Sequence, residues 1–229
     1  MGAESVTVCF TGNPNCGKTT LFNAYTGAGK KTANWPGVTV ALSEGSLMHR
    51  GRLVHLVDTP GIYSLDPYTM EETVTRQCIR DQKADVIIHV ADALLLERSL
   101  FLTMQLLAEG KPLVLALNMM DLVRERGMDI DIGRLSRLLG GIPVIPVSAR
   151  RRTGLEELMD AAVEAARARR MADGSGRFVS GARYSVYRSH SAHSDGPAYG
   201  DGPSGSGGSW HGPVSARELH DLSLIHISE

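Results

Sequence analysis

Short apolar segments alternate with longer amphipathic segments along the first 170 residues. Five brief runs are rich in Val, Ile and Leu and bounded by Gly, Pro or Asp, as buried strands are; they are 6–11, 53–58, 85–91, 113–118 and 144–147. The intervening segments repeat apolar residues at helical spacing, which predicts helices at 19–26, 73–81, 95–109, 131–139 and 153–170. Residues 38–48 have β character and lead through a turn into 53–58, so we expect an antiparallel edge pair there.

This order of elements predicts an α/β fold with three layers. Strand and helix in alternation favour a doubly wound, mostly parallel sheet, here with six strands of which one is an antiparallel edge strand. Ligands of such sheets bind at the carboxyl ends of the strands. The residues that directly follow each strand are therefore the candidates for site chemistry.

The first predicted strand runs into the sequence GNPNCGKT, Gly12–Thr19, and a helix is expected at once after it. A glycine-rich loop between strand and helix lets backbone N–H groups surround a phosphate. In the GxxxxGK[ST] pattern, Lys18 is placed for the β- and γ-phosphate oxygens and the Thr19 hydroxyl for Mg²⁺. An ordinary glycine-rich turn is the alternative, and the strand–loop–helix context favours phosphate. The nucleotide contacts expected here are Gly12, Asn13, Pro14, Asn15, Cys16, Gly17, Lys18, Thr19 and Thr20.

Two further positions are suited to the metal and the γ-phosphate. Asp58, in the sequence DTPG, ends a strand and faces the expected Mg²⁺ site, whereas Gly61 can donate an unobstructed N–H to the γ-phosphate. An Asp that merely begins a Pro-Gly turn is the alternative. Thr39 lies in the segment after the first helix, where it can complete the Mg²⁺ shell in an order–disorder switch or be an ordinary strand-edge residue.

The base is expected beside the predicted strands at 113–118 and 144–147. The first of these strands ends at Asn118, which begins the sequence Asn118-Met119-Met120-Asp121. A carboxylate at Asp121 can accept from guanine N1–H and the exocyclic amine, which adenine cannot match. Ser148 and Ala149 follow the last strand, where a backbone N–H can reach guanine O6. An isolated NxxD is usually only a turn, but in this position it favours GTP over ATP.

Composition and charge narrow the class of protein. The formal net charge is −1, so no nucleic-acid partner is expected, and the three cysteines lack the spacing of a metal site or a disulfide scaffold. The N-terminus has no basic region before its apolar run, and no apolar stretch reaches about 20 residues. We expect the chain as given to be soluble and to come from a reducing compartment.

The chain changes character at Met171. Residues 1–170 are expected to form the nucleotide-binding domain, and 171–220 are rich in Gly and Ser without helical or strand period, which is typical of a flexible linker. The last segment, 221–229, ends in SLIHISE and resembles a translated sequencing-adapter tail. We interpret it as a non-native, truncated end, and assign no function to it.

In this order, the motifs resemble the translation-factor-like branch of the small P-loop GTPases. They are most similar to the cytosolic G domain of the bacterial ferrous iron transporter FeoB. The likeness covers residues 5–170, and its most specific parts are NWPGVTV at 34–40 and the NMMD sequence, which has Met119 where many GTPases have Lys. The family's helical domain and membrane helices cannot be aligned to the residues after Arg170.

The resemblance implies GTP and GDP as ligands, Mg²⁺ as cofactor, and a role in Fe²⁺ uptake. The partner would be a membrane transport domain of a longer parent protein, at the cytoplasmic face of the bacterial inner membrane, and a homo-oligomer is allowed. The iron pathway itself would lie outside this chain.

The expected hydrolysis is slow. Ras-like enzymes place a water-orienting Gln directly after the Asp-x-x-Gly motif, and here that position is Ile62, so turnover below about 10⁻² s⁻¹ is expected. The resemblance suggests that K⁺ neutralises developing charge, bound by Asn15 and by backbone carbonyls near 34–35. Asn15 could instead only hydrogen-bond within its loop. The expected catalytic residues are Asn15, Lys18, Thr39 and Gly61.

Other polar residues suggest weaker hypotheses. Met119 offers dispersion but no charge to the nucleotide, so modest affinity and quick GDP release are expected. Glu71 and Glu72 are more simply a solvated pair. Two rival functions are a freestanding GTPase in ribosome assembly or RNA modification, and a switch without useful catalysis.

Overall fold

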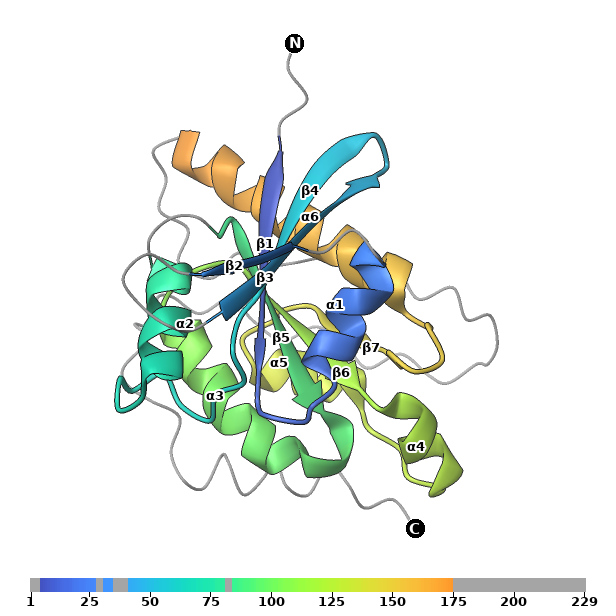
Figure 1. Ribbon diagram of the computed structural model, residues 1–229. Coiled ribbons are helices and arrows are strands. Elements are labelled where there is room, and N and C mark those ends of the chain that lie inside the picture. The colour runs from blue at the N-terminus through green and yellow to red at the C-terminus, as the bar shows by residue number, and fades with distance from the viewer. Residues whose placement is uncertain (1–4, 28–30, 35–40, 81–83, 175–229) are drawn as a thin grey trace, which may run out of the picture.

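The computed structural model describes residues 5–27, 31–34, 41–80 and 84–174. Its centre is one sheet of seven strands in the order β2-β3-β4-β1-β5-β6-β7 (Figure 1). The strands are β1 (Val6–Gly12), β2 (Lys31–Asn34), β3 (Ala41–His49), β4 (Arg52–Asp58), β5 (Val86–Asp92), β6 (Leu113–Asn118) and β7 (Val144–Pro146). β2–β3 and β3–β4 are antiparallel pairs, and the remaining pairs are parallel.

Helices cover both faces of the sheet (Figure 1). They are α1 (Lys18–Thr26), α2 (Met70–Arg80), α3 (Leu96–Ala108), α4 (Met120–Glu125), α5 (Ile132–Leu138) and α6 (Leu155–Gly174), with the 3₁₀ turn η1 (Ala93–Leu95) before α3. Side chains alternate along each strand between the two layers. In β1, Val8 and Phe10 pack in the layer of α1 and α6, whereas Cys9 packs in the layer of α2 and α3.

The predicted fold class is confirmed, and two elements, β2 and α4, are additional to those expected. The sheet has seven strands rather than six, because residues 31–34 add the edge strand β2 and make a second antiparallel pair with β3. The sequence KTAN has no alternation of apolar and polar residues to predict a strand. α4 was not predicted either, since six residues are too few for a helical period.

Helix α2 begins at Met70, three residues before the predicted start. Glu72 Oε2 accepts from Thr69 N at 2.9 Å, and Thr69 Oγ1 accepts from Glu72 N at 3.2 Å. This reciprocal pair is a capping box, which satisfies two free N–H groups of the first turn. Glu72 is therefore a helix cap rather than only a solvated charge.

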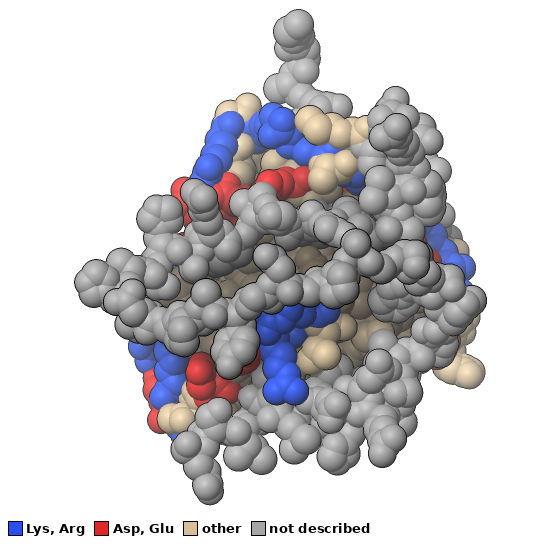
Figure 2. Space-filling model, turned by 180° about the vertical axis from the view of Figure 1, so that it is seen from behind, with Lys and Arg blue, Asp and Glu red and all other residues tan. Residues whose placement is uncertain are grey.

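Charged side chains of both signs share the outer surface (Figure 2). Arg170 near the end of α6 pairs with Asp85 at 2.8 Å, and Arg80 of α2 pairs with Glu109 at 2.8 Å. Within the described residues, every helix is too short or too polar to cross a membrane. The same part of the chain has no group of three or more His, Cys, Asp or Glu that could hold a metal ion.

The register of the parallel strands brings their carboxyl ends to one edge. Phe10 of β1 lies opposite Asp58 of β4, and Asp92 of β5 lies opposite Asn118 of β6. The loops that follow β1, β4, β6 and β7 therefore meet at this edge, as expected for a doubly wound sheet.

Candidate functional site

The loop between β1 and α1 depends on glycine at two points. A Cβ on Gly12 would lie 2.4 Å from the Val90 carbonyl oxygen, so no other residue fits there. Gly17 has φ +85°, and its Cβ would lie 2.3 Å from Asn118 Nδ2. Asn15 also adopts a left-handed conformation, with φ +66°. The loop therefore curls tightly and delivers the chain into α1, whose Leu21 N donates to Gly17 O at 2.9 Å.

Lys18, Thr19 and Asp58 meet at the start of α1. Lys18 Nζ contacts Asp58 Oδ1, and both side chains are almost fully buried. Thr19 Oγ1 lies 3.0 Å from Asp58 Oδ2. The two oxygen groups expected to hold Mg²⁺ are thus side by side, although they come from positions 39 residues apart. Clustered oxygens are the donors that a hard divalent cation takes.

The segment after β4 is tied to the first strand. Thr59 N and Thr59 Oγ1 both donate to Phe10 O, at 3.1 and 2.9 Å, and Ile62 N donates to Gly12 O at 3.1 Å. A Cβ on Gly61 would lie 3.0 Å from Pro14 Cα. Gly61 therefore passes close against the phosphate loop, where a larger residue would press on it. Ile62 is buried.

Asn118 joins the two ends of the candidate site. Its Nδ2 donates to Cys16 O of the phosphate loop at 2.9 Å, and its Oδ1 accepts from Ala149 N at 3.0 Å. The side chain is buried, so both hydrogen bonds are shielded from water. The asparagine of NMMD thus connects the phosphate loop to the loop after β7. The side-chain amide and carbonyl of Asn118 are both hydrogen-bonded to protein groups.

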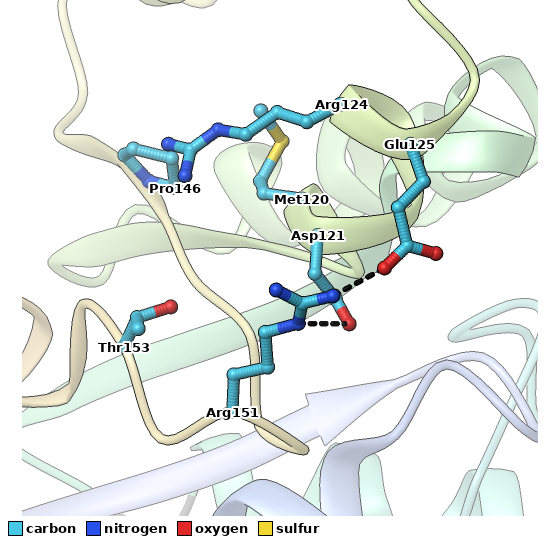
Figure 3. Close-up of a pocket in the computed structure, with 7 residues that line it drawn as sticks. All are labelled: Met120, Asp121, Arg124, Glu125, Pro146, Arg151 and Thr153. Carbon is cyan, nitrogen blue, oxygen red and sulfur yellow. Dashed lines mark hydrogen bonds and ion pairs between the residues drawn. The ribbon is translucent and has the colours of Figure 1, made fainter.

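Asp121 lies at the start of α4 beside a pocket of about 350 Å³. Met119, the residue before α4, has φ +67° and turns the chain from β6 into this helix. Arg151 reaches across from the loop after β7, with its Nε 3.5 Å from Asp121 Oδ2 and its Nη2 in contact with Glu125 (Figure 3). Arg151 N also donates to Ser148 Oγ at 3.1 Å. The carboxylate expected to read the base is therefore one wall of a charged pocket.

Burial sets the chemistry of one cysteine in the phosphate loop. Cys16 is buried, and this burial raises its pKa to about 11. The thiol is neutral at pH 7 and acts as an apolar filler beneath Gly12 rather than as a nucleophile.

Most of the predicted site residues come together at one edge of the sheet. The phosphate loop from Gly12 to Thr20 lies against Asp58 and Gly61, and through Asn118 it is joined to Ala149. Thr39 and Trp35 lie outside the described residues, whereas Asn34, the other residue expected to offer a backbone carbonyl to K⁺, is the last residue of β2. Their expected roles stay predictions.

Two residues at the site were not singled out from the sequence. Arg151 is one of three consecutive arginines at 150–152, and nothing in that run distinguishes the one that reaches Asp121. Gln105 of α3 contacts the segment after Gly61, and its side chain belongs to an otherwise ordinary amphipathic helix.

Known proteins with similar sequences cover the same part of the chain. The family profile described as Ferrous iron transport protein B matches residues 6–162. The Fe(2+) transporter FeoB of Legionella pneumophila (strain Paris) is 47% identical over 151 residues, which are 64% of this chain and 20% of that protein. The Fe(2+) transporter FeoB of Salmonella typhimurium is 43% identical over 159 residues, 68% of this chain and 20% of that protein. The chain thus spans about a fifth of the length of these relatives.

Solved structures of similar sequence have the same fold. The cytosolic domain of the T. maritima FeoB iron transporter in apo form aligns with a TM-score of 0.69 and 42% identity, over 71% of this chain and 64% of that one. A mutant of S. thermophilus NFeoB bound to GDP aligns with a TM-score of 0.67 and 41% identity, over 70% of this chain and 62% of that one. Because the family profile matches well over half of the sequence, this chain belongs to the ferrous iron transport protein B family.

Proposed function

We propose that this chain binds GTP with Mg²⁺ and hydrolyses it to GDP and phosphate, as the regulatory G domain of a ferrous iron transporter. The observation that carries the proposal is the pair of hydrogen bonds through which Asn118 joins the phosphate loop to the loop after β7. With Asp121 three residues further along the chain, this connection would hold a phosphate-binding loop and a base-reading carboxylate at a fixed spacing, as one nucleotide requires. The related NFeoB from S. thermophilus is described as bound to GDP.

At the phosphate end, the protein supplies charge and oxygen ligands. Lys18 is held by Asp58 at the start of α1, from where its ammonium can reach the β- and γ-phosphate oxygens. Thr19 and Asp58 would hold Mg²⁺, which when bound neutralises phosphate charge. The backbone N–H groups of the loop from Asn13 to Lys18 would bind the β-phosphate.

At the base end, the protein supplies discrimination. Asp121 would accept from guanine N1–H and the exocyclic amine, and Ala149 or its neighbours would donate to O6. Adenine would present an acceptor at N1 and no exocyclic amine at C2, leaving the largely buried Asp121 carboxylate with only its long contact to Arg151, which is costly. We infer that this mismatch, rather than the phosphate loop, excludes ATP.

Hydrolysis in this site would be slow and cation-dependent. Ile62 is buried and apolar, so it cannot orient water as the Gln of Ras-like enzymes does. Asn15 is exposed and held in a left-handed conformation at the rim of the loop, a position open to a K⁺ ion beside the phosphates. A cation there would supply the charge that an arginine supplies elsewhere.

The transport role belongs to a longer protein. The curated relatives described above are named as Fe(2+) transporters, and this chain matches about a fifth of each. The partner of the domain would be the membrane part of its parent, with the G domain at the cytoplasmic face of the bacterial inner membrane. These likenesses give no support to a freestanding ribosome-assembly or RNA-modification GTPase.

Nucleotide preference tests the proposal directly. In Mg²⁺ buffer, purified protein is expected to bind fluorescent GDP at least about 100-fold more tightly than ADP, since unmatched buried polar groups are strongly rejected. The variant Asp121→Asn should weaken GDP and strengthen xanthosine diphosphate, because xanthine has a carbonyl where guanine has the amine. Equal affinity for guanosine and adenosine nucleotides would refute the assignment.

The same protein tests the cation. GTP hydrolysis is expected to be at least several-fold faster in KCl than in NaCl at equal ionic strength, and Asn15→Ala should remove most of that difference. Its matched control is Asn23→Ala, an asparagine of α1 outside the phosphate loop. A rate that is the same in both salts would leave Asn15 with only a loop-forming role.

A further inference from the structure

Gln105 of α3 binds the segment that follows Gly61 with both ends of its amide. Its Oε1 accepts from Leu65 N at 2.8 Å, and its Nε2 donates to Ser64 Oγ at 3.0 Å and approaches Asp66 Oδ2 at 3.4 Å. Gln105 is partly buried, and it lies about 40 positions along the chain from the residues it contacts. The contact is therefore a tertiary clamp between a helix and a loop.

The other end of this segment is held by the phosphate loop. Ile62 N donates to Gly12 O at 3.1 Å, and Gly61 passes within close contact of Pro14. Residues 61–66 are thus fixed at one end by the phosphate loop and at the other by Gln105. Tyr63, between these two anchors, has Arg98 of α3 over its ring at 4.2 Å from the centroid.

Helix α3 also reaches the phosphate loop itself. Asn13 Nδ2 donates to Arg98 O at 3.4 Å. The helix therefore contacts both parts of the site that would face the γ-phosphate, namely the loop before α1 and the segment after β4. A glutamine suits the clamp because a single side chain carries the acceptor for Leu65 N and the donor for Ser64 Oγ.

We propose that Gln105 is a positioning residue that sets Gly61 against the phosphate loop, and through it favours GTP over GDP. The inference rests on the proposed function and goes one step beyond it. Under the proposed function the Gly61 N–H would contact the γ-phosphate, which GDP lacks, so its placement would matter for GTP and not for GDP. Loosening the clamp lets Gly61 move away from the loop, which weakens GTP binding and slows hydrolysis while GDP binding is unchanged.

The test measures two affinities with one variant. Gln105→Met keeps the length and helix propensity of the side chain but removes all three polar contacts of its amide. We expect the affinity for a non-hydrolysable GTP analogue to fall about tenfold. The GDP affinity should stay within about twofold. Single-turnover hydrolysis at saturating GTP should also slow. Ser64→Ala removes the contact with Gln105 Nε2 and the two hydrogen bonds between Ser64 Oγ and Asp66, but it keeps the bond from Leu65 N to Gln105. It should reproduce a smaller effect in the same direction.

The control is Glu97→Gln, an exposed position on the same helix, which should leave both affinities unchanged. Equal losses for GDP and the GTP analogue in Gln105→Met would mean that Gln105 only supports the fold, and would overturn the inference. So would two unchanged affinities. Wild-type protein that binds neither nucleotide would instead refute the proposed function, and the inference with it.

Discussion

At the scale of single residues, the site depends on two glycines whose lack of a Cβ leaves room for a close contact. Gly17 is close to Asn118, and Gly12 is close to the Val90 carbonyl. In both places the backbone of one segment approaches another so closely that a methyl group would force them apart. The glycines of the GxxxxGK[ST] pattern therefore serve the contact between β1, β5 and β6 as well as the approach of phosphate.

Gly17→Ala should destabilise the protein and abolish tight nucleotide binding. The left-handed conformation alone costs an alanine about 1–2 kcal/mol, and the new methyl group would displace the Asn118 amide that binds Cys16 O. Thermal unfolding and GDP titration measure the two effects.

Gly141→Ala is the matched control for this change. Its φ is +83°, close to that of Gly17, but a Cβ there meets nothing within 4 Å. The control should lose a similar amount of stability and keep its GDP affinity. If both variants bound GDP equally well, the contact with Asn118 would not matter for the site.

At the scale of elements, the packing of β5 on α3 contains a titratable group. His89 of β5 is fully buried, and its Nδ1 lies 3.0 Å from Thr103 Oγ1 of α3. Its Nε2 has no hydrogen-bond partner among the described residues. Burial lowers the pKa of His89 to about 3, so the folded protein holds this ring neutral.

This burial predicts a loss of stability in mild acid. Below the ordinary histidine pKa of 6.5, His89 binds a proton in the unfolded chain, whereas in the folded protein it stays neutral until about pH 3. The free energy of unfolding should therefore fall as the pH falls from about 6.5 toward 3, and by about 2 kcal/mol between pH 7 and pH 5 from this group alone.

His89→Leu tests the assignment, because leucine fills a similar volume and does not titrate. Thr103 Oγ1 keeps a partner in Ser99 O at 3.2 Å. Urea unfolding of both proteins at pH 7 and pH 5 should show a smaller pH dependence in the variant. The same slope in both would place the acid sensitivity elsewhere.

Elements with a strong period could be predicted from the sequence, and elements defined by contacts could not. The strands at 6–11, 53–58 and 113–118 were found within one residue of their ends, because buried apolar runs mark them. The start of α2 was missed although the sequence carries the signal for it, a Thr three residues before a Glu. β2 has no such signal, since its pairing with β3 comes from tertiary structure.

The candidate site divides in the same way. Motifs with fixed spacing, such as those holding Lys18 and Asp58, could be located from the sequence because their chemistry requires neighbouring residues in order. Gln105 and Arg151 act across large separations in the chain, and their residue types are common on any helix or loop. Only the folded structure distinguishes them.

At the scale of the whole molecule, α6 is the last element along the chain to pack into the described core. This helix extends to Gly174, four residues past the predicted boundary at 170, and Leu158, Met159 and Ala162 pack into the layer that also holds α1. Arg170 near its end pairs with Asp85. Both layers over the sheet are therefore complete within the described residues.

A chain that ends at Gly174 should behave as an independent domain. We expect its midpoint of thermal unfolding to lie within a few degrees of the full chain and its GDP affinity to agree within about twofold, since each core residue is retained. Calorimetry and nucleotide titration of the two proteins make the comparison. A large loss in the shorter chain would show that residues after 174 contribute to the fold or the site.

The two hydrogen bonds of Asn118 have a thermodynamic consequence for partial ligands. One buried amide group restrains both the loop that would hold pyrophosphate and the loop that would hold guanosine. Ordering either loop removes freedom from the other, so the second fragment pays less entropy when it arrives. Guanosine and pyrophosphate, offered as separate molecules, are thus expected to bind cooperatively, each raising the affinity of the other, with Asn118→Ala making the two events independent.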